Sequence, residues 1–141
     1  MLVLAEPLQE LHPADDRPLI LTLKPGDDLK LLKEKAAAMG CRCPWLDGRN
    51  MKDKDGILAE FASAFPLPDY FGRNWDALEE CLGDPGLFKD CQGCMLFIEH
   101  SEALGEADAP ARKMLLDILE SVAQGWASQT PSFPFKTVLI K

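Results

Sequence analysis

Residues 66–82 read PLPDYFGRNWDALEECL, which predicts a stiff loop leading into a short helix. Each proline fixes its own φ and moves the residue before it out of helical space. Gly72 is expected to make the sharp turn, because glycine reaches positive φ without steric cost. Asn74 is the expected N-cap, since its side-chain oxygen can accept a hydrogen bond from an unpaired N–H of the first helical turn. The helix is therefore predicted to begin at Trp75 and to end near Leu82.

This predicted helix carries an apolar stripe and an acidic surface. The apolar positions recur three and four residues apart, at Trp75, Leu78 and Leu82. Asp76 and Glu80 are four residues apart on another face, with Glu79 beside them. Asp76 is explained by the positive end of the helix dipole, whereas Glu79 and Glu80 lie toward the negative end. A solvated acidic face is the simpler interpretation, but acids that directly follow an aromatic, glycine-containing loop favour a recognition surface.

Length and composition indicate one folded domain. The chain has 141 residues, of which 47% are hydrophobic and 27% charged, which is ordinary for a globular protein with its own core. The formal net charge of -8 disfavours direct binding to nucleic acid and favours encounter with a basic partner. No signal-peptide pattern and no bilayer-spanning apolar run is evident in the sequence, so we expect a cytoplasmic protein without membrane contact.

Apolar runs and helical periodicity alternate along the chain. Strands are predicted over residues 19–23, 42–46, 95–98 and 135–140, and helices over residues 28–39, 53–65, 75–82 and 110–123. Met1–Leu4 is apolar enough for a further short strand. Pro44 places its strand at an edge or at a strand end, and Gly125 is expected to break the last helix. The alternation predicts an α/β fold with a mostly parallel sheet and crossover helices.

Five cysteines are present, at Cys41, Cys43, Cys81, Cys91 and Cys94. An odd count without a signal peptide argues against a disulfide framework. The pairs at 41/43 and 91/94 could together supply a four-thiolate zinc site, although one intervening residue in the first pair is fewer than usual. Reduced and largely buried thiols are the main expectation.

At residues 66–82 the sequence resembles the barstar family, the small intracellular inhibitors of barnase-type ribonucleases. The family shows a Leu-Pro-aromatic loop, an aromatic-Gly-x-Asn step and an Asp-Ala-Leu helix with a Cys-Leu pair, and all three stand here between Leu67 and Leu82. Residues 46–48, 96–99 and 137–140 match further parts of the family pattern. The resemblance covers about residues 42–141 and implies a barstar-like α/β core over residues 41–141. Residues 1–40 are expected to be an added strand–helix unit of the same single domain, which could extend the sheet, cover an edge strand or mediate dimerisation.

The resemblance implies a binding module without catalysis, cofactor or metal. In such inhibitors a loop and an acidic helix block the basic active site of a ribonuclease or related nuclease toxin, and carboxylates occupy the places of substrate phosphates. The positions implied for partner binding are Tyr70, Phe71, Gly72, Arg73, Asn74, Asp76, Glu79, Glu80 and Glu120. The chain departs from the family pattern at Phe71, which replaces a tyrosine, at Arg73, which reverses a charge, and at Glu79, which replaces an aromatic. We expect a monomer or a weak dimer that forms a 1:1 complex.

Two other functions stay open at this point. One is a binding module for a different basic protein, which the departures at Arg73 and Glu79 allow. The other is a small enzyme that uses Asp76, Glu80 and His100 as acid–base groups. The sequence offers such an enzyme no nucleophile elbow, no phosphate-binding loop and no complete metal-ligand set.

Overall fold

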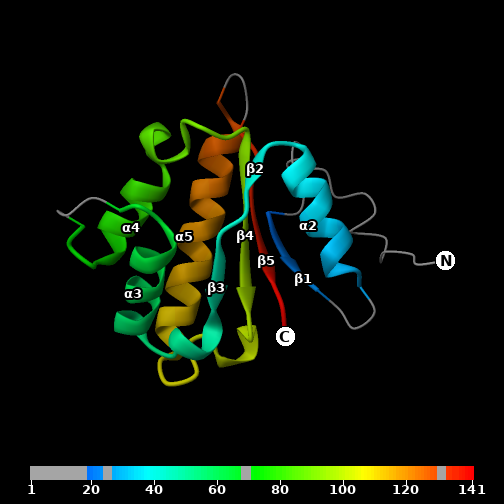
Figure 1. Ribbon diagram of the computed structural model, residues 1–141. Helices are drawn as coiled ribbons and strands as arrows, with labels where there is room; N and C mark the ends of the chain where they lie inside the picture. The colour runs from blue at the N-terminus through cyan, green and yellow to red at the C-terminus, as the bar shows by residue number, and fades with distance from the viewer. Residues whose placement is uncertain (1–18, 24–26, 68–70, 130–132) are drawn as a thin grey trace.

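The computed structural model describes residues 19–23, 27–67, 71–129 and 133–141. Its strands are β1 (Ile20–Thr22), β2 (Cys41–Arg42), β3 (Trp45–Asp47), β4 (Gly93–Glu99) and β5 (Phe135–Leu139). Its α-helices are α2 (Leu29–Ala38), α3 (Lys54–Ala64), α4 (Trp75–Leu82) and α5 (Ala109–Ala127), and three 3-10 turns lie at Gly48–Asn50, Pro85–Phe88 and Ser101–Ala103. Figure 1 shows one sheet with α2 on one face and α3, α4 and α5 on the other.

The sheet is parallel in every strand pair that the structure describes. Its strand order is β1-β5-β4-β2, and β3 also pairs with β4. β4 lies at the centre because it contacts β5 along one side and β2 and β3 along the other, and six of its seven residues are buried. The predicted α/β fold with a mostly parallel, barstar-like sheet is therefore confirmed.

The predicted strand over residues 42–46 is wrong in one respect, because it is two short strands. β2 pairs with Gly93–Cys94 of β4, and β3 pairs with Phe97–Glu99 further along the same strand. Between them lies Pro44, which has no N–H to donate, although its carbonyl oxygen accepts a hydrogen bond of 2.9 Å from the Phe97 N–H. Both strands form the edge of the sheet, as the proline predicted.

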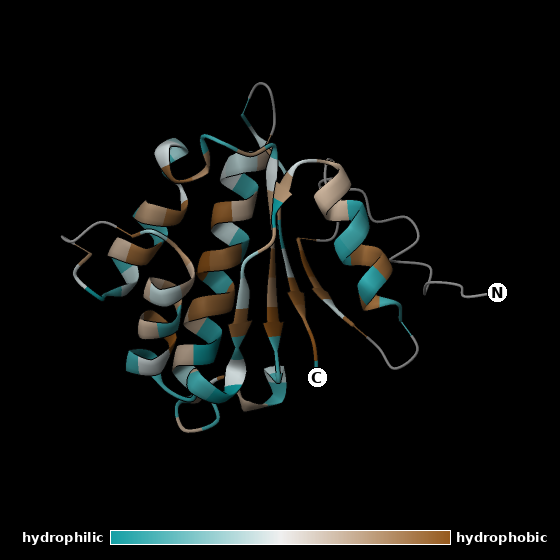
Figure 2. Ribbon diagram, viewed as in Figure 1, coloured by the Kyte–Doolittle hydropathy of each residue, from teal (hydrophilic) through white to brown (hydrophobic). Residues whose placement is uncertain are grey.

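Alternating residues of β4 feed two separate cores. Leu96 and Ile98 pack on the side of α3, α4 and α5, whereas Met95 and Phe97 pack on the side of α2. Figure 2 shows brown, hydrophobic segments along the strands and alternating brown and teal bands along the helices. The second core is completed by apolar residues of β1 and α2, with Leu32 and Ala36 fully covered. The segment before residue 41 thus extends the sheet through β1 and covers one face through α2.

α5 differs from its prediction at its C-terminal end. Gly125 was expected to break this helix, but α5 continues to Ala127. A single glycine costs a helix about 1 kcal/mol, which tertiary packing can offset. Here the buried indole of Trp126 anchors the last turn by donating a hydrogen bond to the Leu82 carbonyl oxygen. The expected strand at Met1–Leu4 lies outside the described residues. Among the residues that are described, no helix has the length and apolar character needed to span a bilayer.

Candidate functional site

The loop–helix segment is held by an N-cap at Asn74. The Asn74 backbone is extended, at φ -130° and ψ 168°, and its Oδ1 accepts a hydrogen bond of 2.7 Å from the Ala77 N–H. This confirms the predicted cap and the helix start at Trp75. The cap fixes the direction in which α4 leaves the loop, and so the positions of its acidic side chains.

The turn before α4 is made by a different residue from the one predicted. Arg73 takes the left-handed conformation, with φ 52°, and Gly72 does not. A Cβ added at Gly72 would lie 3.1 Å from Asn74 Nδ2. The glycine therefore leaves room for the capping side chain, while Arg73 carries the strain that a non-glycine residue meets at positive φ.

The inner face of α4 is anchored in the core on the α5 side of the sheet. Leu78 and Leu82 are fully buried, and Trp75 is half-buried against the same core. At the C-terminal end of the helix, Trp126 Nε1 donates a buried hydrogen bond of 2.9 Å to the Leu82 carbonyl oxygen. A carbonyl in the last turn of a helix has no partner within the helix, so this bond fixes α4 against α5.

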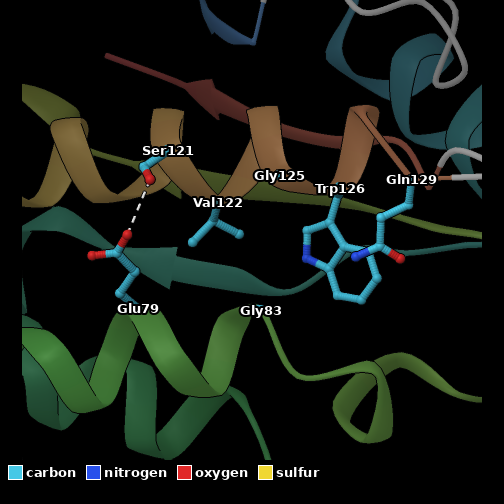
Figure 3. Close-up of a pocket in the computed structure, with 7 residues that line it drawn as sticks. All are labelled: Glu79, Gly83, Ser121, Val122, Gly125, Trp126 and Gln129. Atoms are coloured by element: carbon cyan, nitrogen blue, oxygen red, sulfur yellow. Dashed lines mark hydrogen bonds between the residues drawn. The ribbon is translucent and has the colours of Figure 1, made fainter.

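Glu79 lies on the flank of α4 that faces α5. The Ser121 hydroxyl donates a hydrogen bond of 3.0 Å to Glu79 Oε2, as Figure 3 shows. The two residues stand at one end of an open cleft of about 210 Å³. Its lining residues come from both helices and are Glu79, Gly83, Ser121, Val122, Gly125, Trp126 and Gln129.

Glu80 lines a second cleft, of about 190 Å³, between α4 and the loop that precedes it. The lining residues are Phe71, Gly72, Asn74, Ala77, Glu80, Cys81 and Asp84. Successive residues of a helix are about 100° apart, so Glu79 and Glu80 point to different flanks of α4. Among the described residues, no group donates a hydrogen bond to Glu80. Asp84, which follows Glu80 by four residues, was not among the predicted site residues.

The remaining predicted site residues are not all brought together. Asp76 is exposed on the outer surface of α4 and lines neither cleft. Glu120 is exposed on α5, about 100° around the helix from Ser121, and also lines neither cleft. Tyr70 lies outside the described residues. The structure therefore groups Phe71, Gly72, Asn74 and Glu80 in one cleft and places Glu79 in the other, with exposed Arg73 beside the first.

A second polar cluster lies at the carboxyl ends of β3 and β4. Asp47, Glu99 and His100 each offer a ligand atom within 4.8 Å of the others. The Arg49 guanidinium, however, donates hydrogen bonds of 2.8–3.1 Å to both Asp47 carboxylate oxygens. These bonds lower the pKa of Asp47. The cluster is therefore an ion-pair network in which Asp47 already has a cationic partner.

The position of His100 at the carboxyl end of β4 separates it from the acids of α4. His100 follows the last residue of β4, and its ionic neighbours are Glu99 and Glu102. In Figure 1 the arrowhead of β4 and helix α4 lie well apart in the molecule. Asp76, Glu80 and His100 therefore do not form one acid–base group, and the enzyme that was considered from the sequence loses its proposed catalytic set.

The four cysteines considered for zinc divide between the two faces of the sheet. Cys41 and Cys43 pack against the core beside α2, whereas Cys91 and Cys94 pack against the core on the α5 side. Among the described residues, no three of these thiols lie within 4.8 Å of one another, as one metal ion would require, although Cys91 is near enough to Cys41 to raise its pKa. Burial raises the pKa of Cys41 to about 11 and that of Cys94 well above its ordinary range. Neutral thiols are poor metal ligands and poor nucleophiles.

Comparison with known proteins adds a family. A search of curated proteins finds no match. The family model described as Barstar (barnase inhibitor) matches residues 42–139. This range contains α4, the described part of the loop before it and both clefts, while β1 and α2 lie outside it. Because the match covers well over half of the 141 residues, the chain belongs to the barstar family.

Proposed function

We propose that this protein is an intracellular inhibitor, or immunity protein, of a barnase-type ribonuclease or a related nuclease toxin. The acidic helix α4 and its loop block the active site of the nuclease. The observation that carries the proposal is Glu80, an exposed residue that lines a cleft. Its carboxylate accepts no hydrogen bond from any of the described residues. It lies in the last turn of α4, where the helix dipole disfavours a negative charge. A carboxylate in that position is explained by a cation supplied by a partner.

The mechanism follows from charge and rigidity. A ribonuclease active site must attract phosphate, and carboxylates at fixed spacing offer the same cations an alternative anion. Helix α4 provides that spacing because both its ends are fixed, by the Asn74 cap and by the Trp126 bond to Leu82. Less conformational freedom is then lost on binding. The net charge of -8 adds long-range attraction to a basic partner. The barnase–barstar pair is the standard example of such steering, so our expectation concerns only its direction.

The proposed contact residues have different parts in this mechanism. Asp76 and Glu80 are exposed on the outer surface of α4 and provide charge, while Glu79 shares its carboxylate with Ser121. The loop contributes shape and contact area. Its proposed members are Tyr70, Phe71, Gly72, Arg73 and Asn74. Glu120 on α5 is proposed as a further acidic contact.

We further propose that residues 1–141 form a single cytoplasmic domain, monomeric or weakly dimeric, without direct contact to nucleic acid. Pairing of β1 with β5 and packing of α2 on β4 support the single domain. A second candidate function is a binding module for a basic protein that is not a nuclease. It is favoured by Glu79 and Arg73, which depart from the family pattern on the proposed contact surface.

The test is a titration of the purified protein into a barnase-type ribonuclease assay. We expect stoichiometric inhibition, and we expect Glu80→Gln to weaken it by at least about tenfold because a charge that faces the partner is removed. Glu34→Gln is the matched control, since Glu34 is exposed on α2, on the opposite face of the sheet. Equal losses of inhibition in the two variants would show that inhibition depends on the net charge of the protein and not on the position of Glu80. Absence of inhibition, with capture of another basic protein from the source cell, would support the second candidate.

A further inference from the structure

Arg73 is unusual in the loop before α4 by both its charge and its backbone. It is the single basic residue in the acidic segment 66–84. The residue is exposed, and its backbone takes the left-handed conformation, with φ 52°. That conformation is strained for a residue with a Cβ, whereas the neighbouring Gly72 could take a positive φ without steric cost. The loop therefore holds an exposed cation in a strained position.

The charge of Arg73 lies at the edge of the acidic surface of α4. Its two neighbours, Gly72 and Asn74, line the cleft that contains Glu80, whereas Arg73 does not. A cation among carboxylates is commonly explained by an ion pair within the protein. Among the described residues, however, no carboxylate forms an ion pair with the Arg73 guanidinium and no group accepts a hydrogen bond from it. Its charge is therefore left to act on a partner that approaches α4.

A cation in this place distinguishes between basic partners. The acids of α4 attract any basic nuclease, because long-range attraction depends on the sign of the charges and their distance. Specificity arises from repulsive contacts as well as from attractive ones. Arg73 opposes a nuclease that carries a cation opposite the loop, since like charges that meet at an interface weaken binding strongly. A nuclease with a neutral or acidic group at that place is not opposed.

We propose that Arg73 determines which nucleases this protein inhibits, by excluding those that carry a basic group opposite residue 73. The inference rests on the proposed function, and it narrows the partner to a nuclease whose active-site rim is neutral or acidic at that place. The strained backbone supports it, because such strain is concentrated in segments that bind ligands or partners. Asp76 and Glu80 thus provide attraction, while Arg73 restricts the choice of partner.

The test measures the affinity of the natural chain, Arg73→Glu and Arg73→Lys for a barnase-type ribonuclease by titrated inhibition. We expect Arg73→Glu to bind at least about tenfold more tightly at low ionic strength, with a smaller gain at high salt. Arg73→Lys keeps the charge and should leave the affinity unchanged. Lys30→Glu is the matched control, because it makes the same change in net charge at an exposed position of α2, on the opposite face of the sheet. Thermal unfolding confirms that each variant is folded.

The outcomes separate the role of Arg73 from the proposed function. Inhibition by Arg73→Glu but not by the natural chain would support the exclusion and make the natural target a different nuclease. Equal inhibition by both, or an equal gain in Lys30→Glu or Arg73→Lys, would overturn the role of Arg73 while the proposed function stands. Weaker inhibition by Arg73→Glu would also overturn it. Absence of inhibition by every variant would overturn both the exclusion and the barnase-type target.

Discussion

Ser121 donates a hydrogen bond of 3.0 Å to Glu79, and this bond joins α5 to α4 beside an open cleft. Glu79 thus differs from Asp76 and Glu80, which have no hydrogen-bond donor among the described residues. Three acids that look equivalent in the sequence therefore have two different roles. Glu79 helps to hold the helix, while Asp76 and Glu80 stay available for a partner.

The first prediction separates the charge of Glu79 from its hydrogen bond. Glu79→Gln keeps an acceptor for Ser121, so the free energy of unfolding should change by less than about 0.5 kcal/mol. Ser121→Ala removes the donor and should lower it by about 0.5–1 kcal/mol, because the bond is exposed. Urea unfolding measures both values. A larger loss in Glu79→Gln than in Ser121→Ala would contradict a structural role for the bond.

The second prediction concerns Gly125, an exposed glycine inside α5. A Cβ added there meets nothing within 4 Å, so alanine introduces no clash and favours the helix. Gly125→Ala should raise the free energy of unfolding by about 1 kcal/mol. Gly105→Ala is the contrasting variant, because Gly105 has φ 69° and a Cβ there would clash with Arg112 Cβ. Gly105→Ala should clearly lower the free energy of unfolding. A higher free energy of unfolding in both variants would contradict the prediction.

The third prediction tests the anchor of α4 at Trp126. Trp126→Phe keeps an aromatic ring near Phe88 but removes the N–H that bonds to the buried Leu82 carbonyl oxygen. An unpaired buried acceptor costs about 1–3 kcal/mol, so the variant should lose stability by that amount in urea unfolding. Trp45→Phe is the control, since Trp45 is 36% exposed and its indole nitrogen has no hydrogen bond among the described residues. Similar losses in the two variants would count against the anchor.

The fourth prediction concerns Arg73, which places a positive charge beside the acids of α4. A basic partner is repelled by that charge, so Arg73→Gln should speed association with the ribonuclease at low ionic strength. Stopped-flow association rates measured across a salt series provide the test. The difference from the natural chain should disappear at high salt, where the Debye length is short. A slower rate in the variant would show that Arg73 contacts an acidic group of the partner.

The helix cap and the strand that were predicted correctly depend on local chemistry. An asparagine before an amphipathic run caps a helix whatever surrounds it, so the N-cap at Asn74 and the start of α4 followed from neighbouring residues. The central position of β4 followed in the same way from an unbroken apolar run. The parallel sheet and the family came from patterns that extend over many residues.

The parts that were missed depend on contacts between distant segments. Asp84 lines the cleft of Glu80 only because the chain stays against α4 after Leu82, and Ser121 lines the cleft of Glu79 only because α5 packs beside α4. Gly72 was given the positive φ of Arg73, since composition alone does not show which of two neighbours turns the chain. Gly125 was expected to end α5, but the last turn is held by the bond from Trp126 to Leu82. That bond joins residues 44 positions apart, so the sequence around Gly125 does not reveal it.

The fifth prediction concerns pH and the buried thiols. Burial, with the neighbouring Cys43 and Cys91, raises the pKa of Cys41 from its ordinary value of 9.0 to about 11. A group whose pKa is raised by folding stabilises the folded state below its unfolded pKa and loses that contribution as pH rises through the folded value. The free energy of unfolding should therefore fall between pH 9 and pH 11, and Cys41→Ala should make that fall shallower. Lysines also titrate in this range, so the difference between the two proteins, measured by urea unfolding at each pH, is the quantity to compare. Parallel pH profiles would show that ionisation of Cys41 is not coupled to folding.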